Sequence, residues 1–263
     1  MPTNLPQPSQ SQAHRSQDHR AQAQRSQDHR AQAQRQGPAQ SKTLAKAPTE
    51  IPNVAAFGSG APIKPGPGFN DYPMDSQAVF RLALEAMSKP AQAIPFDFGA
   101  LFKTAPPLPR AVAALALTLA DHLTPVWLSP SFAATENFMV FHTSAPIVRD
   151  PEKAALVLAA SQSELPPLSL LSQGDPRYPD RSATIVLAGV LDDPSPGLSL
   201  LASGPGLAEE IIFEGHGLTE AFVDQWALNR ASYPLGLDVI LAGNASLAGL
   251  PRSLALKPKD GRA

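Results

Sequence analysis

Apolar residues first recur at a regular helical spacing about 80 residues into the chain. Five of them would line one face of a helix: Val79, Phe80, Ala83, Leu84 and Met87. The side-chain oxygen of Asp75 or Ser76 is placed to cap the first turn of this helix. Pro90 ends it, because proline lacks the backbone N–H that the next helical turn would use.

Two more helices and a set of strands follow from the remaining apolar pattern. Residues 110–120 are almost entirely apolar, which predicts a helix that is buried on most sides. Residues 219–230 predict a helix with Phe222, Val223 and Trp226 on one face. Short apolar runs between turn residues predict strands at 125–128, 138–141, 183–191, 198–201 and 237–241. This irregular alternation predicts an α/β fold, with a mixed sheet and flanking helices.

The first 68 residues have a different character. The decamer at 16–25 recurs unchanged at 26–35, and no large apolar residue lies between Leu5 and Leu44. Such a segment cannot bury enough surface to offset the entropy lost on ordering, so we predict a disordered extension over 1–68 and a folded domain over 69–263. The extension is either a basic interaction arm or a tandem expansion without a role. Its histidines have no spacing that defines a metal site: His14, His19 and His29.

Composition narrows the possible functions. The 263 residues are 43% apolar and include no cysteine, which excludes disulfides, cysteine zinc sites and cysteine-ligated iron–sulfur clusters within the chain. Residues 1–68 carry eight Lys and Arg against three Asp and Glu. Residues 69–263 carry thirteen against twenty, so their net charge is −7. An acidic domain is a poor match for nucleic acid.

Location is predicted from the same composition. No apolar run approaches the roughly 20 residues that cross a bilayer, and residues 1–40 lack the apolar core of a secretory signal. We therefore expect a cytoplasmic protein that does not contact a membrane.

Several segments of the domain, taken in order, resemble the PhnH family. They are 69–71 with 75–81 and 87–90, then 117–128, 141–148, 178–184, 203–206, and 233–241 with 250–252. No single segment is specific for this family, but the whole set in this order is. One position departs from the family pattern: Ala91 stands where the family usually has glycine, which matters only if the backbone there has a positive φ.

The resemblance implies a subunit of the carbon–phosphorus lyase core complex. With PhnG-, PhnI- and PhnJ-type partners, such a subunit supports formation of alpha-D-ribose 1-methylphosphonate 5-triphosphate from ATP and methylphosphonate during phosphonate catabolism. The resemblance also implies a homodimer when the protein is isolated, and a fold similar to that of pyridoxal-phosphate-dependent transferases.

The residues do not support that cofactor. Pyridoxal-phosphate catalysis needs a lysine for the Schiff base, and the chain has no lysine between Lys153 and Lys257. We expect no cofactor and no bound metal.

The candidate substrate-binding residues are Arg181 and Arg252, because guanidinium binds phosphate through paired donors. The alternative for each is a salt bridge, of Arg181 with the adjacent Asp180 and of Arg252 with Asp238. A further candidate, the turn at 203–206, could bind an anion through backbone amides but is favoured as a plain turn.

The candidate acid–base residues are Asp121 and His142. His142 is expected just after a strand, where it could act on a proton or bond to a loop carbonyl.

Two functions remain open at this point. One is a complex subunit with a structural or accessory catalytic role, inactive alone. The other is a stand-alone transferase acting on a phosphorylated small molecule.

Overall fold

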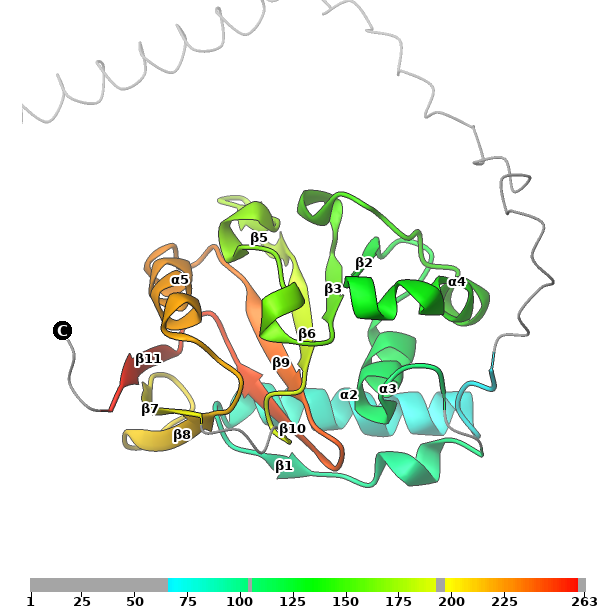
Figure 1. Ribbon diagram of the computed structural model, residues 1–263, viewed down its shortest axis with the longest axis horizontal. Coiled ribbons are helices and arrows are strands. Elements are labelled where there is room, and N and C mark those ends of the chain that lie inside the picture. Colours follow the sequence, from blue (N-terminus) through cyan, green and yellow to red (C-terminus); the bar gives the residue numbers. More distant parts are fainter. Residues whose placement is uncertain (1–65, 104–105, 193–196, 260–263) are drawn as a thin grey trace, which may run out of the picture. The chain divides into compact units, whose positions relative to one another are not determined.

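The computed structural model describes residues 66–103, 106–192 and 197–259. The predicted disordered extension lies outside these residues, except for its last three. Within them, a mixed sheet lies between two layers of other elements, as the apolar pattern predicted (Figure 1). The described helices are α2 (Tyr72–Ser88), α3 (Arg110–Leu119), α4 (Glu136–Thr143) and α5 (Glu220–Ala231).

The main sheet has the strand order β1-β10-β9-β6-β3-β2. Strands β2, β3, β6 and β9 run parallel, whereas β10 and β1 pair antiparallel. The strands are β1 (Ile94–Pro95), β2 (Val126–Leu128), β3 (Leu156–Ala159), β6 (Thr184–Ala188), β9 (Asp238–Ala242) and β10 (Ser246–Leu250).

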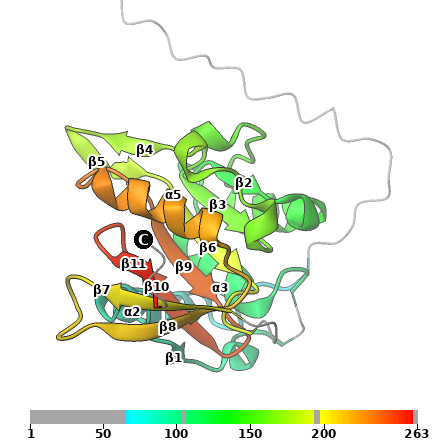
Figure 2. The ribbon, with the colours of Figure 1, turned by 60° about the vertical axis from the view of Figure 1, so that its left-hand side comes forward.

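Two smaller sheets accompany it. The first has the order β11-β7-β8, from Ala255–Pro258, Leu198–Ser203 and Ile211–Gly215. The second is a hairpin of β4 (Gln173–Asp175) and β5 (Tyr178–Ser182), which extends beyond the main sheet (Figure 2). Short 3-10 turns lie at Phe98–Leu101, Pro130–Thr135, Pro151–Lys153, Gln162–Glu164 and Leu168–Leu170.

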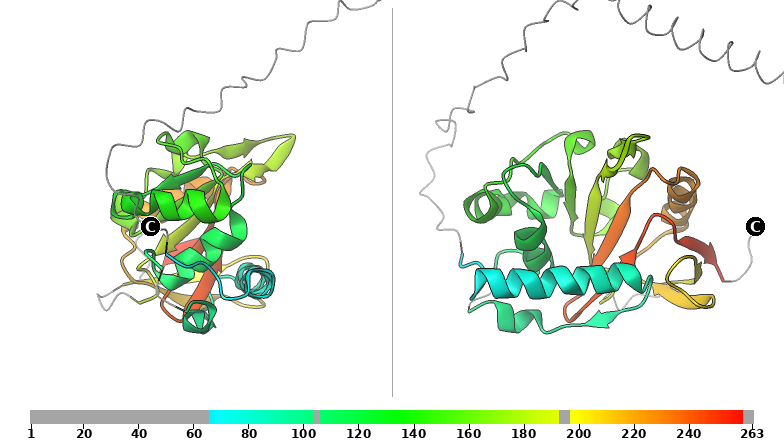
Figure 3. Two further views of the ribbon diagram at one scale, coloured as in Figure 1. Left: turned by 90° about the vertical axis from the view of Figure 1, so that its right-hand side faces the viewer. Right: turned by 180° about the vertical axis from the view of Figure 1, so that it is seen from behind.

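Both faces of the main sheet are buried, because side chains alternate along each strand. In β3, Leu156 and Leu158 join the core beneath α2, α3 and α4. Val157 and Ala159 join the opposite core, which is covered by α5 and the three-stranded sheet. Figure 3 shows α2 lying across one side of the main sheet, with the small sheet of β7, β8 and β11 beside the C-terminal end of this helix. Among the described residues, no helix has the length and apolarity that a membrane span needs.

Two predictions for helix α2 are wrong, that of its first residues and that of its buried face. It begins earlier than expected, because Asp71 is its cap: the Asp71 carboxylate accepts from the Met74 N–H, and Asp75 accepts from the Asp71 N–H. Its buried face also differs from the predicted one. Phe80 and Leu84 are 47% and 54% exposed, whereas the buried residues are Val79, Leu82, Ala83 and Ala86.

The strand predicted at 138–141 is wrong, because these residues belong to α4. A four-residue apolar run fits a helix as well as a strand. Burial shows the helical pattern: Phe138 and Met139 face the core, whereas Phe141 is 67% exposed. The helix ends at Ser144, whose φ of 57° is left-handed. The predicted helices at 110–120 and 219–230, and the strands within 125–128, 183–191, 198–201 and 237–241, are confirmed.

The departure at Ala91 falls on a position with a positive φ, 58°. Its N–H donates to the Gly249 carbonyl at 2.8 Å, which fixes the turn after α2 against β10. Gly249 is itself required there, since an added Cβ would lie 2.5 Å from the Ala86 carbonyl oxygen. A left-handed alanine is strained. Ala91 is buried, with 7% of the residue exposed, and packs in the core beneath α5, so burial of its methyl group offsets part of this strain.

Candidate functional site

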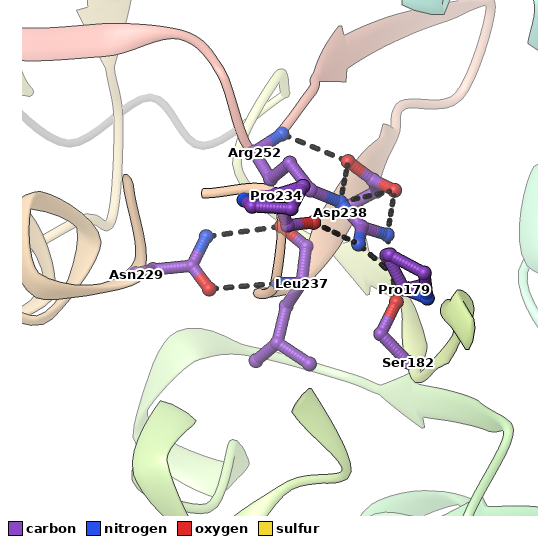
Figure 4. Close-up of polar contacts among 7 residues, drawn as sticks. All are labelled: Pro179, Ser182, Asn229, Pro234, Leu237, Asp238 and Arg252. Carbon is purple, nitrogen blue, oxygen red and sulfur yellow. Dashed lines mark hydrogen bonds and ion pairs between the residues drawn. The ribbon is translucent and has the colours of Figure 1, made fainter. Parts of the chain in front are cut away.

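The densest polar network among the described residues surrounds Arg252, just after β10 (Figure 4). Its Nη2 lies 2.5 Å from the Asp238 Oδ2 and 2.6 Å from the Ser182 hydroxyl. Nη1 donates to the carbonyls of Pro179 at 2.9 Å and Pro234 at 3.2 Å. Nε and the backbone N–H donate to Asp238 as well.

A guanidinium has five N–H donors, and these contacts use all of them. The salt bridge between Arg252 and Asp238, which the sequence left as an alternative, is therefore formed, with the side chains 15% and 24% exposed. A phosphate that bound Arg252 would have to displace bonds within the protein. Arg252 thus joins the first residue of β9 to β5 and to the turn after α5, and it fixes how the hairpin leaves the sheet.

A second link, from α5, supports the same corner. The Asn229 side chain donates to the Leu237 carbonyl at 3.0 Å and accepts from the Leu237 N–H at 2.7 Å (Figure 4). Gly236 has a φ of +114°, and a Cβ there would lie 2.8 Å from the Asn229 Oδ1. Only glycine allows this close approach. Sequence reasoning missed Asn229 and Ser182, because no local pattern reveals a partner that is close only in the fold.

Arg181 lies on the hairpin, in a different environment from Arg252. Its guanidinium carbon is 3.9 Å from the centroid of the Tyr178 ring, and both side chains are exposed. At the hairpin tip, the Asp175 carboxylate accepts from the backbone N–H groups of Arg177 and Tyr178. The ion pairs among the described residues do not include Arg181, so the alternative pairing with Asp180 is not formed there. Stacking holds the guanidinium plane while leaving its edge donors exposed.

Asp121 lies in the turn between α3 and β2. Its Oδ1 accepts from the Thr124 hydroxyl at 2.7 Å and from the Leu123 N–H at 2.9 Å. These hydrogen bonds, with that from Thr124 as the largest cause, lower the pKa of Asp121 from its ordinary value. The carboxylate is fully exposed and acts locally as the cap of this turn.

His142 is in the last turn of α4 rather than after a strand, since the expected strand is a helix. Its Nε2 lies 2.7 Å from the Gly66 carbonyl oxygen, and its ring packs near Phe138 and Phe141. The bond to a loop carbonyl, one of the two roles open from the sequence, is therefore formed. The side-chain hydrogen bonds of Asp121 and His142 go to different partners, so no contact between these two residues unites them as an acid–base pair.

The described lysines are all exposed: Lys89, Lys103, Lys153, Lys257 and Lys259. A Schiff-base lysine works in a desolvated pocket, so these residues do not fit pyridoxal phosphate.

Across 66–103, 106–192 and 197–259, no group of three or more His, Asp or Glu is arranged to hold a metal ion. The turn at 203–206 is a plain turn, without a following helix.

A shallow pocket of about 270 Å³ lies between α2 and the starts of β3, β6 and β9. Phe80, Leu84 and Leu119 give it an apolar wall, and Thr184 and Asp238 contribute polar atoms. Asp238 thus borders the pocket as well as holding Arg252. Most small-molecule sites are larger and more enclosed than this.

Together these features define an α/β protein with a mixed sheet, in which Arg252 is bound within the protein and Arg181 is exposed on a projecting hairpin. A sequence model of the family described as "Bacterial phosphonate metabolism protein (PhnH)" matches residues 67–257, and the chain belongs to this family. It is also 33% identical over 194 residues to the "Alpha-D-ribose 1-methylphosphonate 5-triphosphate synthase subunit PhnH" of Rhizobium meliloti (strain 1021). That match covers 72% of this chain and 94% of the relative.

Proposed function

We propose that this chain is a subunit of the carbon–phosphorus lyase core complex. In that role it supports formation of alpha-D-ribose 1-methylphosphonate 5-triphosphate from ATP and methylphosphonate, in the catabolism of organic phosphonates. The observation that carries the proposal is the match to a synthase subunit along nearly that protein's whole length. Its partners in the complex would be subunits of the PhnG, PhnI and PhnJ types. We place the complex in the cytoplasm, where ATP is available.

Several features favour a subunit over a stand-alone transferase. The described lysines are exposed, and the acid–base candidates Asp121 and His142 are bonded to separate partners.

The likeness to the pyridoxal-phosphate transferase fold stays a proposal about architecture. The parallel strands β2, β3, β6 and β9, with antiparallel β10, are compatible with it.

Within the complex, we assign the two arginines different roles. Arg181 would contact an anionic group of the substrate, because its guanidinium is exposed, held against Tyr178 and outside the ion pairs of the described residues. Arg252 would position the hairpin, because one of its bonds goes to the Pro179 carbonyl, two residues before Arg181. Arg252 therefore acts on substrate only through β5.

Asp121 and His142 stay proposals as acid–base residues. If His142 moves a proton in the reaction, His142→Ala should change the pH profile of product formation by the complete complex as well as its rate. If His142 only anchors Gly66, the substitution lowers stability and leaves the pH profile unchanged.

A reconstitution with one component left out tests the proposed function. Three samples receive ATP and methylphosphonate: the partner subunits alone, this chain alone, and all of them together. We expect the ribosyl phosphonate and free adenine only in the complete mixture. Free adenine from this chain alone would favour the stand-alone transferase. Full product from the partners alone would show that the chain is dispensable.

A further inference from the structure

Two exposed tyrosines lie on segments that Arg252 holds next to each other. Tyr178 immediately precedes Pro179 on β5, and Tyr233 immediately precedes Pro234 in the turn after α5. The Arg252 Nη1 donates to both proline carbonyls, at 2.9 and 3.2 Å (Figure 4). Because one nitrogen binds both carbonyls, a single side chain positions the two tyrosines, although they are far apart in the sequence.

The backbone around Tyr233 is held firmly in place. The Tyr233 N–H donates to the Arg230 carbonyl at 3.1 Å, and the Gly236 N–H donates to the Gln173 carbonyl of β4 at 3.0 Å. These bonds keep the turn against the base of the hairpin, and Figure 2 shows the end of α5 beside it. Tyr233 is nevertheless 65% exposed. An exposed ring on a fixed backbone is prepared for a ligand, because little conformational freedom is lost on binding.

The hairpin places cationic donors beside an aromatic ring. The Arg181 guanidinium covers one face of Tyr178, with its carbon 3.9 Å from the ring centroid, and Tyr178 remains 47% exposed. The ion pairs of the described residues do not include Arg181. The ring contacts of the described residues do not pair Tyr178 with Tyr233, so neither ring covers the other.

We propose that these residues bind a purine nucleotide, with Tyr178 and Tyr233 offering aromatic faces to the base and Arg181 donating to the phosphates. Every base has a flat face that stacks on aromatic side chains, and planar guanidinium donors match phosphate oxygens. A ligand that uses both features at once has an aromatic ring and an anionic tail. This inference rests on the proposed function, in which ATP is a reactant, and it names the part of ATP that this chain would hold.

Calorimetric titration of the purified full chain with ATP, adenosine and inorganic tripolyphosphate tests this site. The wild-type chain is expected to bind ATP more tightly than either fragment. Tyr233→Ala should weaken the binding of ATP and of adenosine about tenfold, because one stacking contact is lost, and leave tripolyphosphate binding unchanged. Arg181→Ala should weaken the binding of ATP and of tripolyphosphate and leave adenosine binding unchanged.

Conservative variants separate stacking from a structural effect. Tyr178→Phe and Tyr233→Phe keep the ring, so both should bind ATP as the wild type does, whereas Tyr178→Ala should bind it more weakly. The matched control is Phe141→Ala, at an aromatic residue that is 67% exposed on α4, which packs on the opposite face of the main sheet. This control should leave the affinity for ATP unchanged.

Three results would overturn the proposal. They are a wild-type chain that does not bind ATP, a Tyr233→Ala variant that binds all three probes as the wild type does, and loss of assembly with partner subunits at an unchanged affinity for ATP. The last result would assign the tyrosines to a protein interface instead. None of the three decides the proposed function, which is judged by product formation in the reconstituted complex.

Discussion

The Arg252 guanidinium donates hydrogen bonds to the Asp238 carboxylate from both Nε and Nη2, and the Arg252 backbone N–H donates to the same carboxylate. The two residues lie 14 positions apart, at the start of β9 and just after β10, and their pairing closes one corner of the sheet. The bonds of Arg252 to Pro179, Ser182 and Pro234 extend this closure to the hairpin and to the turn after α5.

Arg252→Ala is expected to destabilise the isolated chain by about 2–4 kcal/mol, because it leaves the Asp238 charge partly buried and unpaired. Urea unfolding followed by circular dichroism measures this loss. The control is Arg181→Ala, which removes an exposed side chain and should change stability by less than about 0.5 kcal/mol. If the Arg252 variant were as stable as the wild type, Arg252 would not stabilise the contact between β9, β5 and the turn after α5.

Ser144→Gly is expected to stabilise the chain by about 0.5–1 kcal/mol. Ser144 is exposed and has a φ of 57°, a conformation that glycine adopts without strain. The matched control is Ser169→Gly, at another exposed serine whose φ is not positive, and it should be neutral or slightly destabilising. A lower melting temperature for Ser144→Gly than for Ser169→Gly would contradict the backbone argument.

Asp121 should contribute to the acid sensitivity of the fold. Its folded-state pKa is lowered by the hydrogen bonds from Thr124 and Leu123. Its stabilising contribution is therefore present above the unfolded pKa of about 4 and is lost as the pH falls through the lower folded pKa. Asp121→Ala should be less stable than the wild type at pH 7, and the difference should shrink below about pH 4. Thermal unfolding across this range measures it; a difference that stays constant with pH would count against the assignment.

A chain beginning at Gly60 should fold with an unchanged melting temperature, because the composition of residues 1–59 offers little apolar surface for burial. A chain beginning at Pro67 would also lose the Gly66 carbonyl, which lies 2.7 Å from the His142 Nε2. We expect this second truncation to cost about 0.5–1.5 kcal/mol, the net contribution of one hydrogen bond. Equal destabilisation by both truncations would show that residues 1–59 stabilise the fold.

Much of the fold could be predicted, because its core elements carry strong local patterns. The helix around Trp226 and the strand from Asp238 follow from periodicity and turn residues alone. The run from Phe138 to Phe141 was assigned wrongly, since it is too short for its period to be read. The outer face of α2 was also misread, because a helix with apolar residues on two sides does not reveal which side the sheet covers.

The candidate site was only partly predictable. The pairing of Asp238 with Arg252 was one of two alternatives, and sequence could not choose between them, because that choice depends on how many donors find partners in the fold. Ser182 and the Pro179 carbonyl complete the set from a strand 70 or more residues away. The stacking of Arg181 on Tyr178, three residues apart, was within reach of local reasoning but depends on the shape of the hairpin.

The most direct test of the account is the rate of ribosyl phosphonate formation by complete complexes that carry Arg181→Ala, with assembly assayed on the same sample. An arginine–phosphate contact is worth about 1.5–3 kcal/mol, so its loss in the transition state should slow the reaction about ten- to a hundredfold. Arg181→Lys should recover only part of the rate, because lysine lacks paired planar donors. The account predicts this loss with normal assembly and an unchanged melting temperature. A complex with Arg181→Ala that assembles normally and forms product at the wild-type rate would contradict it.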